Sequence, residues 1–457
     1  MKKTLLALTL LSSVGITVPV QAVTYHEPNA QMEANLNHYG AGVENWEEKR
    51  FVQFTMADAH LYHHWAQVEN NPNKAMPIKV LNSFDPAKVM LDDVIPGHKI
   101  SLYDVMRDRA SIQNYVIMNK KGEVIAEDYW NGTNKDTLNH IMSSTKSFSS
   151  MAAFIAEEEG LLSMNDPIGK YAPELKGSEW ANIPLHYYAD MTAGVVKLPK
   201  SRDGYHWSNY AAGADGSWDS SMPSAMGYNG HVEKDGKLIP RPDANGEINS
   251  FSEYLSKVFV KQAKPANPPG FGYEYRDINT EMLGLAVSRA SGMTLAEFYE
   301  KYLWKKGGFT SDMAMYTSVN KESMASGAAN MTTRDFAIGS FLMVNDGMNF
   351  KGEQVLPKKY IEQVKNGDAE VKQAWGRISY EHLLMPTAFY KNQWRTVEFG
   401  GRKFSTMIGV NGQFSAFDHK TGNIIALTGA YREPSGQAMV LLYVEQVILN
   451  IFNQLDK

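Results

Sequence analysis

The stretch Ile141-Met142-Ser143-Ser144-Thr145-Lys146 decides how the rest of this sequence is interpreted. A helix is predicted over residues 143–159, because its apolar residues recur at the spacing that lines one helix face. Gly160, which directly follows three glutamates, predicts where this helix ends. Residues three positions apart share a helix face, so Ser143 and Lys146 are expected to point into the same space.

A serine and a lysine placed in this way can act as a nucleophile and its base. A serine hydroxyl is a weak nucleophile and needs a base. A lysine serves as that base only if burial or a nearby positive charge lowers its proton affinity. The helix N-terminus also offers free backbone N–H groups and the positive end of a dipole. Ser143 is therefore the candidate nucleophile and Lys146 its candidate base.

The chain contains a second Ser-x-x-Lys motif, Ser318-Val319-Asn320-Lys321. A chain of this length is expected to show about one or two such motifs by chance. No apolar helical run follows this one, so we interpret it as an accident of sequence.

The segments around the first motif predict the fold class. Strands are expected on both sides of it, and the short turns between the C-terminal ones favour an antiparallel sheet. The predicted strands are 115–118, 123–129, 404–409, 412–417 and 424–430. A last helix, about 435–455, is expected to pack on this sheet, with a membrane-surface helix as the alternative.

These elements predict an α/β (α+β) fold, with an antiparallel sheet flanked by helices and a mostly helical inserted domain. The sheet domain is assigned to residues 105–162 and 331–457. The helical, loop-rich domain is assigned to 163–330, with helices at 279–290 and 295–299. Residues 23–104 form an N-terminal extension whose role the sequence leaves open. The cleft between the two domains is the default site for a ligand.

Composition excludes several classes of protein. The 457 residues include no cysteine, which excludes disulfides, a thiol nucleophile and cysteine-ligated zinc. His60, His63 and His64 lie close together, but no carboxylate or further histidine stands at a matching spacing. We therefore predict a solvated helix face there and no metal site.

The first 22 residues predict export. Lys2 and Lys3 precede an apolar run, and Val20-Gln21-Ala22 has small residues at the positions that a signal peptidase recognises before its cleavage site. Cleavage after Ala22 is expected, and with it a periplasmic or secreted protein. The remaining chain has a net charge of about −7 and no long basic run, which argues against nucleic acid as a partner. No later apolar run reaches about 18 residues, so no membrane span is expected after cleavage.

Tyr275-Arg276-Asp277 is the second candidate for the chemistry. It follows a Pro- and Gly-rich loop and precedes the predicted helix 279–290. Tyr275 could carry a proton between nucleophile and leaving group, and Lys146 nearby would stabilise its phenolate. An ordinary packed aromatic residue is the alternative, because the chain has 23 tyrosines.

The order of these motifs resembles the serine β-lactamase and penicillin-binding-protein superfamily. Within it the sequence is most similar to the class C-like branch, with the family VIII esterases and 6-aminohexanoate-dimer hydrolases. Four further segments carry the resemblance in the correct order: 161–167, 173–175, 191–194 and 275–292. The resemblance covers residues 105 to 450 and implies the β-lactamase-like fold.

The resemblance also implies roles for the catalytic residues. Ser143 would be acylated, while Lys146 and Tyr275 would share the acid and base work, and the sequence does not settle which is the acylation base. The backbone N–H groups of Ser143 and Gln413 would form the oxyanion hole. No cofactor is needed for this mechanism.

One stretch that spells a family motif is interpreted as a decoy. Lys420-Thr421-Gly422 reads as the Lys-Thr-Gly box, but it lies where a hairpin turn is expected. The matching stretch is instead 409–413, which resembles a Gly-x-His-Gly-Gln variant with Asn411 in place of histidine. Asn411, Gly412 and Asp277 are the candidate substrate-binding residues.

Two departures from the family pattern weaken the β-lactamase and D,D-peptidase alternatives. Asp277 replaces the usual asparagine, and Val410 stands in the position of the box lysine. They favour a substrate without a carboxylate at that position, or one with a cationic group near Asp277. Trp207, Trp218 and Tyr228 could form an aromatic wall for it, or simply pack a loop.

We therefore expect an exported serine hydrolase that cleaves an amide or an ester through an acyl-enzyme on Ser143. The substrate would be a small molecule or short oligomer, either an amide like a 6-aminohexanoate oligomer or a carboxylic ester. A homo-oligomer is compatible with the sequence. A non-catalytic binding or sensor module of the same fold is the alternative from another class.

Overall fold

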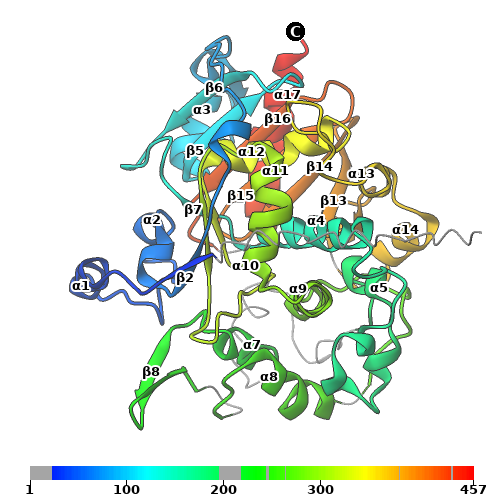
Figure 1. The fold of residues 1–457 in the computed structure, drawn as a ribbon. Helices are drawn as coiled ribbons and strands as arrows, with labels where there is room; N and C mark the ends of the chain where they lie inside the picture. The colour runs from blue at the N-terminus through cyan, green and yellow to red at the C-terminus, as the bar shows by residue number, and fades with distance from the viewer. Residues whose placement is uncertain (1–22, 195–217, 243–245, 263, 380, 434–435) are drawn as a thin grey trace, which may run out of the picture.

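The structure, a computed structural model, describes residues 23–194, 218–242, 246–262, 264–379, 381–433 and 436–457. The predicted signal peptide and Trp207 lie outside these residues, as does the side chain of Trp218. In Figure 1 the strands of the large sheet fill the upper half and helices α7, α8 and α9 the lower half, with α4 between them. The helix that carries Lys146 thus lies where the two halves meet.

The larger sheet has seven strands, each antiparallel to its neighbours, in the order β12-β13-β14-β15-β16-β5-β6. Ile425 pairs with Ile117, so the N-terminal and C-terminal parts of the chain are joined within one sheet. The predicted strands are confirmed to within three residues at each end. The strands are β5 (Ile112–Met118), β6 (Val124–Tyr129), β12 (Phe389–Lys391), β13 (Trp394–Phe399), β14 (Arg402–Gly409), β15 (Gln413–Asp418) and β16 (Ile424–Gly429).

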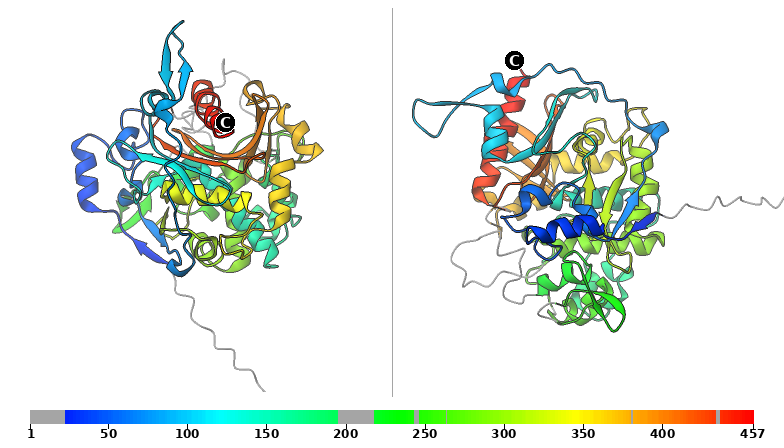
Figure 2. Two further views of the ribbon diagram at one scale, coloured as in Figure 1. Left: turned by 90° about the horizontal axis from the view of Figure 1, so that it is seen from above. Right: turned by 90° about the vertical axis from the view of Figure 1, so that its left-hand side faces the viewer.

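Helices cover both faces of this sheet, because alternate residues of its strands are buried on opposite sides. On β16, Ile424 and Ala426 face the core shared with α4 (Thr145–Glu158) and α12 (Thr333–Val344). Ile425 and Leu427 face the core shared with the C-terminal helix. Figure 2 shows this C-terminal helix and α12 on opposite sides of the strands.

The C-terminal helix packs as predicted. It runs without a break through α16 (Gln437–Leu441), residues Leu442–Leu449 and α17 (Asn450–Leu455). Within the described part of the chain it is the one helix long and apolar enough to cross a membrane. Tyr443, Val447 and Ile451 are nevertheless buried against the sheet. Its apolar face is therefore accounted for by the core.

A second, five-stranded sheet was not predicted from the sequence. Its order is β1-β2-β10-β11-β7, so strands of the N-terminal extension join strands from the middle of the chain. Each strand has only two to four residues, too few for a period to show. They are β1 (Thr24–His26), β2 (Trp65–Val68), β7 (Asn139–His140), β10 (Met313–Tyr316) and β11 (Ala329–Met331). The last strand, β7, leads directly into the Ser143 segment.

The prediction of a solvated helix face at the three histidines is wrong, since His64 lies outside a helix with its side chain only 12% exposed. His60 and His63 are buried. The ring of His63 stacks on Tyr316 at 3.9 Å between centroids. Together with Trp46, His140 and Tyr228 these rings form one cluster. The extension is therefore packed into the core beside the Ser143 segment, because its aromatic residues supply one side of this cluster.

The remaining elements are shorter helices and two hairpins. In the second half of the molecule α9 packs against α4, and its start is two residues earlier than predicted. Thr294 and Glu297 form a capping box at the start of α10. The helices are α1 (Ala30–His38), α2 (Val52–Thr55), α3 (Leu102–Asp104), α5 (Leu185–Ala189), α7 (Trp218–Ala225), α8 (Phe251–Lys257), α9 (Asp277–Ser291), α10 (Leu295–Phe298), α11 (Lys305–Gly307), α13 (Lys358–Asn366), α14 (Ala369–Trp375) and α15 (Glu381–Leu384). The hairpins are β3–β4 (Met90–Asp92 and Lys99–Ser101) and β8–β9 (His231–Lys234 and Lys237–Pro240).

Candidate active site

Ser143 lies in a tight turn directly before α4. Residues Met142–Ser144 form a single 3₁₀ turn, and α4 follows at Thr145. Met142 has a φ of 49°, a left-handed conformation that is uncommon for a residue with a long side chain. The neighbouring strand end requires glycine, since a Cβ on Gly409 would lie 2.4 Å from the Ile141 carbonyl oxygen. The turn that presents Ser143 is therefore packed tightly against the end of β14.

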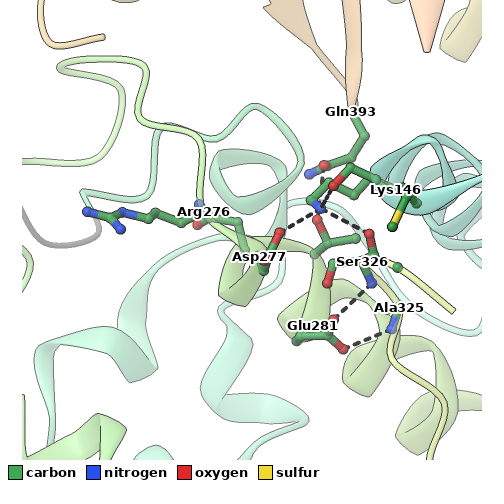
Figure 3. Close-up of polar contacts among 12 residues, drawn as sticks. Lys146, Arg276, Asp277, Glu281, Ala325, Ser326 and Gln393 are labelled. Carbon is green, nitrogen blue, oxygen red and sulfur yellow. Dashed lines mark hydrogen bonds and ion pairs between the residues drawn. The ribbon is translucent and has the colours of Figure 1, made fainter. Parts of the chain in front are cut away.

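The side chain of Lys146 is buried, with 1% of its surface exposed, and it connects the site (Figure 3). Its Nζ donates to Ser143 Oγ at 2.9 Å and to the carbonyl oxygen of Ser326 at 2.9 Å. It also forms an ion pair with Asp277 Oδ1 at 2.6 Å. An ammonium group has three N–H donors, and three acceptors surround this one.

The surroundings of Lys146 favour its charged form. Burial by itself would lower the pKa of Lys146, but the carboxylate of Asp277 and the hydroxyl of Tyr275 outweigh burial and raise it. Lys146 is therefore an ammonium at neutral pH. The condition that would make it a base in the resting state, a lowered proton affinity, is not met.

Tyr275 lies beside Lys146, as the sequence predicted. The Lys146 Nζ is 4.9 Å from the centroid of the Tyr275 ring. A second cation, the guanidinium of Arg395, has its Cζ at 4.9 Å from the same centroid. Tyr390 meets the ring edge-on at 6.1 Å. The phenol is therefore held among aromatic and cationic groups from three parts of the chain.

The β14–β15 hairpin carries the other predicted residues. The Ser144 hydroxyl donates to the carbonyl oxygen of Gln413 at 3.3 Å, so the hairpin lies against the nucleophile turn. Asn411 is buried with a φ of 60°, and its amide donates to the carbonyl oxygen of Tyr431 at 2.9 Å. Gly412 is required because a Cβ there would meet the hydroxyl of Tyr443. Asn411 and Gly412 thus shape the turn, and the oxyanion hole at Gln413 stays a prediction.

Comparison with known proteins agrees with this geometry. The model of the family described as Beta-lactamase matches residues 106–428. The chain belongs to the β-lactamase family. The 6-aminohexanoate-dimer hydrolase of Paenarthrobacter ureafaciens is 24% identical over 315 residues, which cover 68% of this chain and 71% of that protein.

Solved structures show the same fold. A Bacillus anthracis protein described as a candidate 6-aminohexanoate-dimer hydrolase superposes with a TM-score of 0.73 at 20% identity, over 94% of this chain and 99% of that one. A family VIII carboxylesterase superposes with a TM-score of 0.51 at 12% identity, over 76% of this chain and 95% of that one. The predicted fold and family resemblance are thus confirmed.

The Lys-Thr-Gly stretch of this β-lactamase-family chain is a surface turn, as interpreted. Residues 419–423 connect β15 to β16, and Lys420 is exposed and paired with Asp456 at 2.9 Å. Thr421 donates to Asp418 at 2.6 Å, which stabilises the turn. Neither residue contributes to the site.

The sequence did not single out Glu281 or the loop that its carboxylate holds. Glu281 is buried on α9, and its carboxylate accepts from the backbone N–H groups of Ala325 at 2.9 Å and Ser326 at 2.8 Å. It thereby fixes the loop whose Ser326 carbonyl accepts from Lys146. Burial raises the pKa of Glu281 to about 7. The sequence held one clue to this role, because Glu281 follows Asp277 by four residues and so lies on the same helix face. A charged residue on a helix is usually exposed to solvent, however, so Glu281 was not selected.

Within the described residues, no group of three or more histidine, aspartate or glutamate side chains is arranged to hold a metal ion.

Proposed function

We propose that this chain is an exported serine hydrolase that cleaves an amide or ester bond through an acyl-enzyme on Ser143. The observation that carries the proposal is the 2.9 Å hydrogen bond between the Ser143 hydroxyl and the buried Lys146. A serine whose hydroxyl accepts a hydrogen bond from a buried lysine is the arrangement expected of an activated serine nucleophile.

The contacts of Lys146 favour Tyr275 as the group that carries the proton. Lys146 donates a hydrogen bond to Ser143 Oγ and is ion-paired with Asp277, so it has no free lone pair to accept a proton. Tyr275 in its phenolate form would take the Ser143 proton as the Oγ–carbon bond forms. It would then give that proton to the leaving nitrogen or oxygen as that bond breaks. In deacylation, a water would give a proton to Tyr275 as its oxygen bonds to the acyl carbon, and Ser143 Oγ would take that proton as the ester bond breaks and the acid leaves.

The oxyanion would be held by backbone donors. The N–H groups of Ser143 and Gln413 are the predicted donors, and the contact between Ser144 and Gln413 supports their proximity. The charge of the tetrahedral intermediate would also be stabilised by the ammonium of Lys146.

The substrate is proposed from charge and from the relatives together. Val410 places an apolar residue where the family's box has a lysine for a substrate carboxylate, and Asp277 adds a negative charge beside Lys146. A linear amide like the 6-aminohexanoate oligomers, or a carboxylic ester, fits better than a β-lactam or a D-Ala-D-Ala peptide. The names of the similar proteins support the same order.

The test is the intact mass of the protein after treatment with a fluorophosphonate. One adduct is expected on the wild type and none on Ser143→Ala, while Ser318→Ala should be labelled like the wild type. Untreated wild-type protein would then be assayed with p-nitrophenyl esters, linear amides and nitrocefin. If the wild type is not labelled and turns over none of these, the proposal is wrong and a non-catalytic binding module takes its place.

Export is part of the proposal and has a test of its own. Protein recovered from a bacterial host that expresses residues 1–457 should have the mass of a chain that begins at Val23. A mass that includes Met1, together with recovery only in the cytoplasmic fraction, would overturn the export proposal.

A further inference from the structure

Arg395, on β13, is a buried cation that the sequence did not single out. Its Nε and Nη2 bind both carboxylate oxygens of Glu381, at 2.8 Å and 3.0 Å. Its Nη2 also lies 3.2 Å from the hydroxyl of Tyr273, which itself donates to Glu381 at 2.9 Å. This two-point bond fixes the plane of the guanidinium.

The flat face of the same guanidinium contacts two rings. Its Cζ is 4.9 Å from the centroid of Tyr275 and 5.2 Å from that of Tyr390. A cation within about 6 Å of a ring face is attracted to it, and the attraction grows when the ring carries a negative charge. Because Glu381 fixes the guanidinium, the guanidinium in turn restricts where the Tyr275 ring can lie.

We propose that Arg395 is a positioning residue for Tyr275, holding the ring beside Lys146 and adding a second positive charge to it during the proton transfer. The inference rests on the proposed function, in which Tyr275 carries the proton. As the Ser143 Oγ–carbon bond forms, the phenolate becomes a neutral phenol, and when the leaving group takes the proton the phenolate returns. A fixed cation beside the ring favours the phenolate stage.

The groups that act on Tyr275 come from every element packed around it. They are Lys146 of α4, Asp277 of α9, Tyr390 of β12, Arg395 of β13, Glu381 of α15 through Arg395, and Tyr273 of its own loop. Of these, Lys146 and Arg395 are positive. The charge of Arg395 is partly balanced by Glu381, so changing Glu381 alters its effect without removing it.

Two variants test the proposal, and each alone can overturn it. Arg395→Met with Glu381→Gln removes the ion pair as a unit and leaves no unpaired buried charge. The rate of fluorophosphonate labelling is expected to fall at least about tenfold, and the acid-side midpoint of its pH profile to rise by about one unit. Glu381→Gln alone leaves Arg395 unbalanced, and the same midpoint is expected to move to lower pH. These opposite shifts report charge, which a purely structural role would not produce.

The matched control is Arg402→Met with Asp418→Asn. Arg402 is also buried, is paired with Asp418 at 3.0 Å and has its Cζ 5.9 Å from the Phe452 ring, but it lies away from Tyr275. Its pH profile should be that of the wild type. An unchanged midpoint in either folded test variant, or shifts of the same sign in both, would overturn the role of Arg395 alone. A wild type that is neither labelled nor active on the substrate panel would overturn the proposed function, and with it this inference.

Discussion

Two Ser-x-x-Lys segments occur in this chain, and the fold treats them differently. In the first, Ser143 and Lys146 lie on consecutive turns of a helix start and bind each other at 2.9 Å. In the second, the Ser318 hydroxyl accepts from the backbone N–H groups of Asn320 and Glu322. Lys321 has a φ of 65° and is exposed, with its Nζ 4.5 Å from the ring of Tyr25.

The difference shows what a catalytic pair needs beyond its spacing. A spacing of three residues brings two side chains together only in a helix, and the second segment is a turn. Its serine hydroxyl accepts hydrogen bonds from the backbone of the turn, and its lysine lies at the surface. In the first pair Ser143 is half-buried, while Lys146 is buried and surrounded by a carboxylate, a carbonyl and a phenol.

The largest expected effect separates the two serines. Ser143→Ala should reduce turnover by at least about 10⁴-fold, because the step that forms the acyl-enzyme is lost. Ser318→Ala should leave turnover unchanged but lower the free energy of unfolding by about 1 kcal/mol, since two backbone N–H groups lose their acceptor. Ester hydrolysis and urea unfolding measure the two effects. Equal loss of activity in both variants would erase the distinction.

A smaller effect is expected for the two lysines. Lys146→Met should lower kcat about 10²- to 10⁴-fold, because it removes the cation beside Ser143 and Tyr275. Asp277, left without its partner, is 40% exposed and can be hydrated, so the variant should fold. Lys321→Met, the matched change in the second segment, should retain wild-type kcat. A Lys146→Met enzyme within about threefold of the wild type would show that its charge is not used.

The pH dependence of kcat/KM tests how Asp277 acts on Lys146 in the first Ser-x-x-Lys segment. It raises the pKa of Lys146, so Asp277→Asn should lower that pKa by about one unit or more. The alkaline limb of kcat/KM, where Lys146 loses its charge, is then expected to move to lower pH by the same amount. Asp456→Asn, which removes the partner of the exposed Lys420, is the control and should not move it. A limb that moves to higher pH in Asp277→Asn would contradict the assignment.

The smallest expected effect concerns protein stability and the buried carboxyl of Glu281, which holds the loop beside Lys146. The pKa of Glu281 is raised by burial from 4.5 to about 7, so between these pH values the unfolded chain releases a proton that the folded chain keeps. The free energy of unfolding should therefore fall by up to about 3 kcal/mol as pH rises through this window. Glu281→Gln should remove that part of the fall.

Urea unfolding at pH 5 and pH 7.5 measures the slope. Some slope remains in the variant, because burial also raises the pKa of Glu47 to about 7 and of Asp335 to about 6. Lys79→Met, at an exposed ion pair, provides the control slope. If Glu281→Gln and the wild type have the same slope, the carboxyl of Glu281 is already ionised at pH 5.

The sequence predicted those parts of the fold that depend on patterns among neighbouring residues. The strands β14, β15 and β16 are joined by short turns, and the apolar residues of α4 recur at the helical period with a glycine after the helix. The five-stranded sheet was not predicted because its strands are short and pair with strands that are far away in the sequence. His63 was misplaced for a related reason, since its ring partners Tyr228 and Tyr316 come from distant segments.

In the site, the sequence by itself determined that a serine and a lysine share one helix face, because a spacing of three residues is a local property of the backbone. Only the tertiary structure decided the charge of that lysine and the surroundings of Tyr275. Asp277, the Ser326 carbonyl, Glu281 and Arg395 act through space, and the strength of each depends on burial and distance. Neither quantity exists until the chain has folded.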